Sequence, residues 1–308
     1  MLARTYWRNS TTAAAAKIKV SSVPTKEDFP TSTVQVVEAK DLSLQNFQDN
    51  FSRAKKPVII EGLELTQHPW TFSFLKRVAG HYCVDLRYAM PDSIEWAKLE
   101  SSGKSVSIRD FIESIEEEEQ AGKETKKGYL FDWSLPLHCP ELYKDFSVPF
   151  YFEESRDYLK KVDCSLYKRS WPSLFISPPG TVSDLHIDAF GSNFWMALLA
   201  GRKKWTFFQP KWTPFLSPRY FDTFDPVFQV DWQQVKVERL EVTLTPGQVL
   251  FVPAGCPHQV ENLEASVAVS GNIGNVTILH IAKANLFSTL QWMKATSRSA
   301  CSISAATR

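Results

Sequence analysis

The chain has 308 residues, of which 44% are hydrophobic and 22% charged, as in a soluble globular protein with a sizeable core. Its 35 basic and 34 acidic residues give a net charge of +1, so no global field attracts it to nucleic acid or to an anionic membrane. The longest apolar runs, such as Phe194–Ala200, are far shorter than the ~18 residues that a membrane-spanning helix needs.

Cysteine usage and N-terminal composition bear on the compartment. The five cysteines are odd in number, widely spaced and without a C-x-x-C pair, which argues against a disulfide framework or a structural zinc site. They indicate free thiols in an intracellular compartment, nuclear or cytoplasmic. The first acidic residue is Glu27, and the basic stretch before it has a composition shared with mitochondrial transit peptides. A disordered tail over residues 1–30 is the favoured interpretation, with a targeting peptide as the alternative.

The N-terminal part of the expected globular region, residues 31–280, opens with short elements. An apolar alternation covers Val34–Val37, and the apolar spacing between Leu42 and Phe51 suits an amphipathic helix. The β-branched run KKPVIIEGL, Lys55–Leu63, is opened by Pro57 and closed by Gly62, so it predicts a strand.

Two further helices and a strand are expected next. Trp70–Val78 has a helical pattern and Val84–Tyr88 an extended one. Ser107 is a suitable cap for a helix with Asp110 in its first turn, and Gly122 is a suitable end for it.

From residue 128 onward, short strands separated by Pro and Gly turns dominate. This pattern fits a double-sheet jelly roll with the ligand site in the mouth of the barrel. Residues 211–234, rich in Pro and Phe, are predicted to form an insertion over that mouth. Apolar residues at helical spacing between 280 and 296 predict a helix, so residues 281–308 are assigned as a C-terminal helix and tail.

Two potential metal ligands share one of these strands. His186 and Asp188 are two residues apart in an extended segment, so both side chains are expected on the same face. A third, His258, follows an apolar strand and turn. Two imidazoles and one carboxylate, with other coordination positions open, form the facial set suited to a non-haem Fe(II) that binds a cosubstrate and dioxygen. His186, Asp188 and His258 are therefore the candidate metal ligands and catalytic residues.

An isolated H-x-D pair is more often an ordinary half-buried histidine beside a turn residue, so the surrounding motifs decide the interpretation. Here a Gly/Ser/Asn turn follows the pair, and the next strand carries paired lysines before an aromatic residue. The sequence V-P-A-G comes shortly before His258. In this combination the chain resembles the Jumonji C (JmjC) family of Fe(II)- and 2-oxoglutarate-dependent oxygenases, from about Pro57 to Ile273. The resemblance implies a mainly β fold with flanking helices, a cupin-like double-stranded β-helix.

The resemblance also implies a 2-oxoglutarate site. The distal carboxylate of this dianion needs a cation, because an unpaired buried charge is costly. Lys203 matches the family lysine with this role, and on a strand it shares a face with Trp205 and Phe207 while Lys204 points away. Further family hydroxyl groups that contact the cosubstrate have counterparts here, although each also suits an ordinary barrel residue. These are Ser183, Tyr129 and Ser270.

One position departs from the pattern of the small protein-hydroxylase branch, which the chain otherwise resembles most. That branch has an asparagine on the strand between the metal loop and the lysine, and this chain has Met196 there. One polar contact is thereby lost. The departure bears on a shared substrate more than on shared cofactors.

The resemblance implies an Fe(II) cofactor, 2-oxoglutarate and O2 as cosubstrates, and hydroxylation of a protein side chain with release of succinate and CO2. Demethylation of a protein N-methyl group by the same chemistry is an alternative. A metal-dependent hydrolase would accept the same ligands, but no H-E-x-x-H helix is present to supply its general base. A non-catalytic cupin-like binding protein is a further alternative. A protein substrate is the expected partner, a homodimer through the C-terminal helix is open, and nucleic acid is not indicated.

Overall fold

The computed structural model describes residues 31–89, 99–122, 128–153, 170–188, 192–211 and 238–274. The predicted tail at 1–30, almost all of the predicted insertion at 211–234 and the predicted helix in 281–308 lie outside these ranges. No helix within the ranges is long and apolar enough to cross a membrane.

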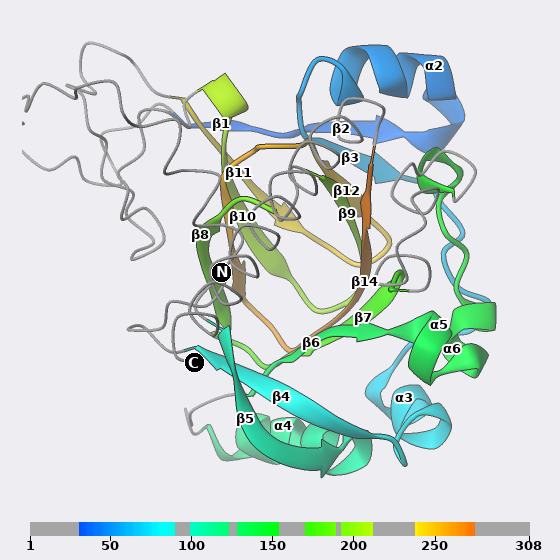
Figure 1. Ribbon diagram of the computed structural model, residues 1–308, viewed down its shortest axis with the longest axis vertical. Helices are drawn as coiled ribbons and strands as arrows, with labels where there is room; N and C mark the ends of the chain where they lie inside the picture. Colours follow the sequence, from blue (N-terminus) through cyan, green and yellow to red (C-terminus); the bar gives the residue numbers. More distant parts are fainter. Residues whose placement is uncertain are drawn as a thin grey trace, which may run out of the picture.

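Two sheets face each other and enclose the interior of a barrel (Figure 1). The smaller, five-stranded sheet has the order β1, β11, β10, β13, β8, and only the β1 and β11 pair is parallel. Its strands are β1 (Thr31–Thr33), β8 (Val182–His186), β10 (Lys203–Phe208), β11 (Arg239–Leu244) and β13 (His258–Asn262).

The larger, seven-stranded sheet has the order β2, β3, β12, β9, β14, β7, β6, and only the β2 and β3 pair is parallel. Its strands are β2 (Gln35–Glu38), β3 (Val58–Glu61), β6 (Leu130–Ser134), β7 (Ser173–Ser177), β9 (Asn193–Ala200), β12 (Val249–Val252) and β14 (Ser266–Ile273). A separate ribbon pairs β4 (Cys83–Ala89) with β5 (Leu99–Ser107). The predicted mainly β class and double-stranded β-helix are confirmed.

Side chains of the seven-stranded sheet alternate between the barrel interior and an outer helical layer. On β9, Phe194, Met196 and Leu198 join an interior cluster that also contains Trp205 and Phe207 of the opposite sheet. Their neighbours on β9 belong instead to an outer cluster. Both faces of the strand are therefore apolar and buried, which explains why its sequence is a continuous apolar run rather than an alternation. Met196, at the departing position, is one of the interior residues.

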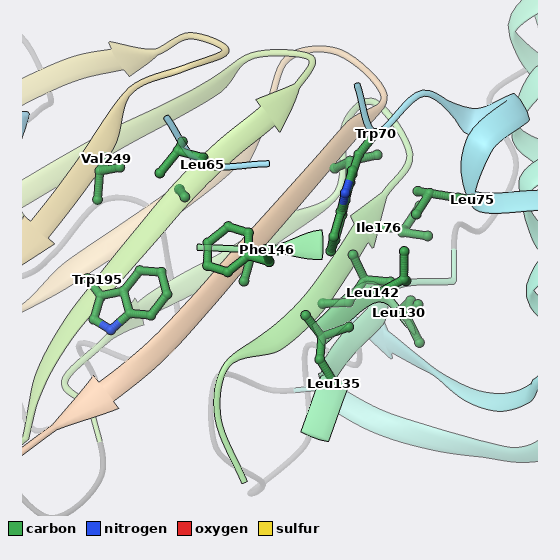
Figure 2. Close-up of a cluster of buried hydrophobic side chains, with 14 of the residues drawn as sticks. Leu65, Trp70, Leu75, Leu130, Leu135, Leu142, Phe146, Ile176, Trp195 and Val249 are labelled. Atoms are coloured by element: carbon green, nitrogen blue, oxygen red, sulfur yellow. The ribbon is translucent and has the colours of Figure 1, made fainter. Parts of the chain in front are cut away.

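Helices cover the outer side of this sheet and the β4–β5 ribbon (Figure 1). They are α2 (Leu44–Phe47), α3 (Phe72–Val78), α4 (Ile108–Ala121), α5 (Leu135–His138) and α6 (Pro140–Asp145), with short 3-10 helices at Ala39–Asp41 and Phe150–Phe152 and a short π-helix at Gln48–Ser52. Figure 2 shows the outer cluster, in which Trp195 of β9 and Ile176 of β7 lie with Phe146, Leu142 and Trp70 from the helical side. This layer packs on the outer face of the sheet, so the inner face lines the barrel interior.

The helices predicted within the described ranges are confirmed, with small shifts at their ends. The Ser107 side chain accepts from the backbone N–H of Asp110 at 3.0 Å, and Gly122 ends the helix in the left-handed region at φ 60°. The helix expected from Trp70 begins at Phe72, because the Thr71 side chain accepts from the backbone N–H of Phe74 and so caps it.

Gly201 makes the tight turn that joins β9 to β10. Its φ is 79°, and a Cβ there would lie 2.2 Å from the carbonyl oxygen of Ala265 and 2.8 Å from Ser266. Both the backbone conformation and the close approach to β14 therefore require glycine. The turn sets the start of β10 at Lys203, and so determines where this lysine enters the barrel.

Asp145, at the end of α6, ties the loop before α3 to the helical layer. Its carboxylate accepts from Trp70 Nε1 at 2.7 Å and contacts His68 Nδ1. Burial acts to raise the pKa of Asp145, but the hydrogen bonds from His68 and Trp70 outweigh it and leave that pKa below its usual value. The ionised carboxylate is thus a stabilising partner of a buried indole.

Asp145→Ala is expected to lower the free energy of unfolding by about 1–3 kcal/mol at pH 7, because the Trp70 N–H loses its buried acceptor. Since the folded-state pKa is lowered, this contribution is complete above the unfolded pKa of about 3.9 and is lost as the pH falls through the folded value. Chemical denaturation between pH 3 and pH 7 measures both effects. Asp49→Ala, which removes an exposed ion pair with Arg53, is the control and should change stability by less than about 1 kcal/mol. Equal losses of stability in the two variants would contradict the role assigned to Asp145. So would a difference in stability between Asp145→Ala and the native protein that does not narrow at low pH.

Candidate metal centre and anion site

Strand β13 pairs with both β8 and β10, and this pairing sets the site residues in rows across the barrel. His258 is opposite His186 on one side and Phe207 on the other. Four residues away along β13, Asn262 is opposite Lys203. At about 3.3 Å per residue, the lysine row lies about 13 Å along the strand from the histidine row.

A β-bulge decides which side chains of β8 enter the barrel. His258 and Val260 are two residues apart on β13, but their partners His186 and Ser183 are three apart on β8. The extra residue on β8 turns the strand, so Ser183 and His186 occupy the same face despite their odd spacing. Asp184, between them, is half-exposed.

Hydrogen bonds to backbone carbonyls define the tautomers of both histidines. His186 Nδ1 lies 2.6 Å from the carbonyl oxygen of Asp184, and His258 Nδ1 lies 2.9 Å from that of Cys256. A carbonyl only accepts, so each Nδ1 carries the proton and each Nε2 presents its lone pair. Metal-binding histidines are usually held in this way.

The three predicted ligands meet at one point. A ligand atom from each of His186, Asp188 and His258 lies within 4.8 Å of the other two, and the two imidazole centroids are 4.3 Å apart. Asp188 reaches this cluster from the segment just after β8. The predicted convergence is confirmed. It is the one such group of three or more metal-ligating side chains in the described part of the chain.

Aromatic rings surround the His258 side of the cluster. His258 stacks on Trp205 at 5.7 Å and lies 6.4 Å from the ring of Phe194. Burial, followed by the proximity of His258, holds the pKa of His186 well below its usual value. Burial likewise raises the pKa of Asp188. Burial therefore favours the neutral imidazole of His186, which is the form that binds a metal, and it disfavours the Asp188 carboxylate, which a divalent cation would stabilise.

Lys203 is buried at the other end of the interior. Only 1% of it is exposed, and it lies on the interior side with Trp205 and Phe207, as predicted. Its Nζ donates to Ser177 Oγ at 3.2 Å and to Asn262 Oδ1, and lies 5.7 Å from the ring centroid of Tyr129. Burial lowers the pKa of Lys203 to about 7. Lys204 instead points outward, 3.7 Å from Glu241.

The three predicted hydroxyl residues are buried, but they do not form one group. Tyr129 is beside Lys203, its hydroxyl is hydrogen-bonded to Ser177, and burial raises its pKa, so it is a protonated donor. Ser183 lies in the row between the histidines and the lysine, opposite Val260. Ser270 is on β14 in the opposite sheet, two residues after interior Ala268, so its parity directs it into the barrel.

Sequence reasoning missed two polar residues that contact Lys203. Asn262 follows His258 by four residues on one strand, and this even spacing could have indicated a shared face. Ser177 lies on β7, and no spacing in the sequence relates it to Lys203. Trp205 Nε1 is a further buried donor, and it has no hydrogen-bond partner among the described residues.

A double-stranded β-helix with a His, Asp, His cluster at one end of its interior defines a cupin-type protein with a candidate metal centre. In agreement, the family described as the cupin-like domain matches residues 44–272. The chain belongs to this family.

Curated relatives support the resemblance to JmjC oxygenases. The chain is 32% identical to lysine-specific demethylase 8 of Danio rerio over 74% of its own length and 55% of the relative's. It is 26% identical to arginine-specific demethylase JMJ22 of Arabidopsis thaliana over 84% of its length and 48% of the relative's. It is 32% identical to 2-oxoglutarate and iron-dependent oxygenase JMJD4 of Homo sapiens over 54% and 42%, respectively. The chain thus spans about half the length of these relatives.

Asp188→Ala should weaken Mn(II) binding more than about 100-fold, because it removes the only anionic ligand of the cluster, and loss of an outer-shell partner alone costs 10- to 100-fold. Titration followed by electron paramagnetic resonance measures this without any turnover. Asp184→Ala is the matched control, since its half-exposed carboxyl lies four residues before Asp188 and its backbone carbonyl, which holds His186, is retained. Equal affinities of the Asp188 variant and the native protein would exclude this metal site.

Proposed function

We propose that the protein is an Fe(II)- and 2-oxoglutarate-dependent dioxygenase that hydroxylates a side chain of another protein. The observation that carries this proposal is the pairing of two features in one interior. A His, Asp, His cluster lies at one end, and a buried lysine lies at the other, in a backbone row about 13 Å along the strands from the histidine row.

The ligand cluster fits Fe(II). His186 and His258 present Nε2 lone pairs and Asp188 adds one negative charge, which leaves a divalent ion with a net charge of +1. Three protein ligands on one side leave positions for a bidentate cosubstrate and for dioxygen, as in the facial set of non-haem iron oxygenases. A structural zinc site would instead be closed by four protein ligands.

The interior also fits 2-oxoglutarate. Lys203 supplies the cation for the distal carboxylate, and Tyr129 supplies an adjacent hydroxyl donor. Ser183 lies between the two ends, and Ser270 faces the interior from the opposite sheet. The N–H of Trp205 is a buried donor that lacks a partner among the described residues, which suits a barrel that receives a polar ligand.

When bound, Fe(II) and 2-oxoglutarate supply oxidative decarboxylation to succinate and CO2 coupled to insertion of oxygen into a substrate C–H bond. In this chemistry the protein orients the metal ligands and the cosubstrate and excludes water from the site. Carbonyl groups fix the two imidazoles, Lys203 fixes the far end of the cosubstrate, and Trp205 and Phe194 keep water from the histidines.

The choice of substrate rests on the names of the relatives. Two are named demethylases and one an oxygenase, and another, of Caenorhabditis elegans, is a bifunctional arginine demethylase and lysyl-hydroxylase. Hydroxylation of an N-methyl carbon gives a hemiaminal that loses formaldehyde, so one insertion step accounts for both activities. Demethylation is therefore the second candidate function. Hydroxylation would be detected as a mass increase of 16 Da in the substrate protein, and demethylation as release of formaldehyde.

N-oxalylglycine tests the cofactor assignment without turnover, because it retains both carboxylates of 2-oxoglutarate but cannot be decarboxylated. In Mn(II)-loaded protein, at a hundred times its Kd, it should stabilise the fold by about 2.7 kcal/mol. A thermal shift assay measures the effect, and His186→Ala should abolish it. A shift with a zinc-directed hydroxamate and none with N-oxalylglycine would favour a hydrolase.

Lys203→Ala should raise the KM for 2-oxoglutarate by roughly 10- to 150-fold, since a buried charge-assisted hydrogen bond contributes about 1.5–3 kcal/mol. Mn(II) affinity should be unchanged, because the lysine row is remote from the cluster. Lys204→Ala, on the outer face of the same strand, should leave the KM within about twofold. The rate of succinate formation without added protein substrate gives the KM for 2-oxoglutarate of both variants. A larger effect at Lys204 than at Lys203 would overturn the assigned role.

A further inference from the structure

Asn262 is the partner that fixes the Lys203 ammonium group. Its Oδ1 accepts from Lys203 Nζ and, at 3.1 Å, from Ser266 Oγ. Its Nδ2 donates to the backbone carbonyl of Thr181 at 2.8 Å. Asn262 is 1% exposed, so these contacts are shielded from water.

The chemistry of these partners allows only one orientation of the amide. An ammonium group only donates, and a carbonyl only accepts, so Oδ1 must face Lys203 and Nδ2 must face Thr181. The backbone of Asn262 is held as well, since its N–H donates to Thr181 at 2.9 Å and its carbonyl accepts from Gly180 at 2.7 Å. The acceptor is therefore rigid with respect to both β10 and the turn that leads into β8.

The contacts of Lys203 within the described part of the chain are all uncharged. They are the amide of Asn262, the hydroxyl of Ser177 and the face of the Tyr129 ring. A buried lysine is normally paired with a carboxylate, because an uncompensated charge is costly. The carboxylate of Glu241, opposite Thr206 on β10, lies instead 3.3 Å from Arg239 and 3.7 Å from Lys204 on the outer face.

We propose that Asn262 is a positioning residue that aims Lys203 while leaving its charge uncompensated, so that the site selects a dianionic 2-oxo acid over a monoanionic one. This inference rests on the proposed function. A carboxylate at position 262 would form an ion pair with Lys203 and occupy the charge that the cosubstrate requires. The neutral amide provides the same acceptor geometry without that competition.

The test uses two acids of identical chain length, 2-oxoglutarate and 2-oxopentanoate, which lacks the distal carboxylate. Their Kd values are measured calorimetrically on the Mn(II)-loaded native protein and on Asn262→Asp, Asn262→Ala and Lys203→Ala. The native protein should prefer 2-oxoglutarate by roughly 10- to 150-fold. Asn262→Asp, which is nearly isosteric, should reduce the preference to within about threefold and leave the Kd of 2-oxopentanoate within about threefold of the native value.

The outcomes separate this inference from the proposed function. If Lys203→Ala loses the preference and Asn262→Asp keeps it, Asn262 has no such role, although the cosubstrate site stands. If the native protein shows no preference, the proposed function itself fails. Should Asn262→Asp not fold, Asn262→Ala decides, since it should weaken 2-oxoglutarate by about three- to tenfold and spare 2-oxopentanoate. Equal weakening of both acids would show a merely structural role and overturn the inference.

Discussion

The pairing of β13 with two neighbouring strands is the constraint on which the site depends. Through it, His258 is opposite His186 and Asn262 is opposite Lys203. Because strands keep a fixed rise per residue, the distance between the ligand cluster and the lysine is built into the register. A slip by one residue would turn either end out of the barrel. The helical layer behind the opposite sheet completes the enclosure, so both ends are desolvated.

Desolvation gives these few polar groups their chemical character. Burial disfavours the ionised forms of His186 and Asp188, and it lowers the pKa of Lys203 to about 7. A metal and a dianion would each relieve the cost of burying the group opposite it. An interior that buries these polar groups differs from an ordinary hydrophobic core.

Much of the fold was accessible from the sequence. The cap at Ser107 and the glycine at position 122 set the ends of α4, because these effects act within one turn of chain. The start of α3 was less well predicted. The apolar pattern of this helix begins at Trp70, but Thr71 caps the helix, so it starts only at Phe72. The continuous apolar run of β9 identified a buried strand but could not show which side faces the barrel, because both faces are covered.

The features of the site likewise fall into those that the sequence predicted and those that only the structure revealed. The sequence by itself predicted that His186, Asp188 and His258 converge and that Lys203 rather than Lys204 faces the interior, because residue type and strand parity are local properties that a motif retains. Only the tertiary structure decided that Ser183 shares a face with His186, since this depends on a bulge created by pairing with β13. It also decided that Asn262 and Ser177 hold the lysine. Those contacts join strands that are 59 and 26 residues from Lys203, and such contacts arise from sheet closure, which no local pattern encodes.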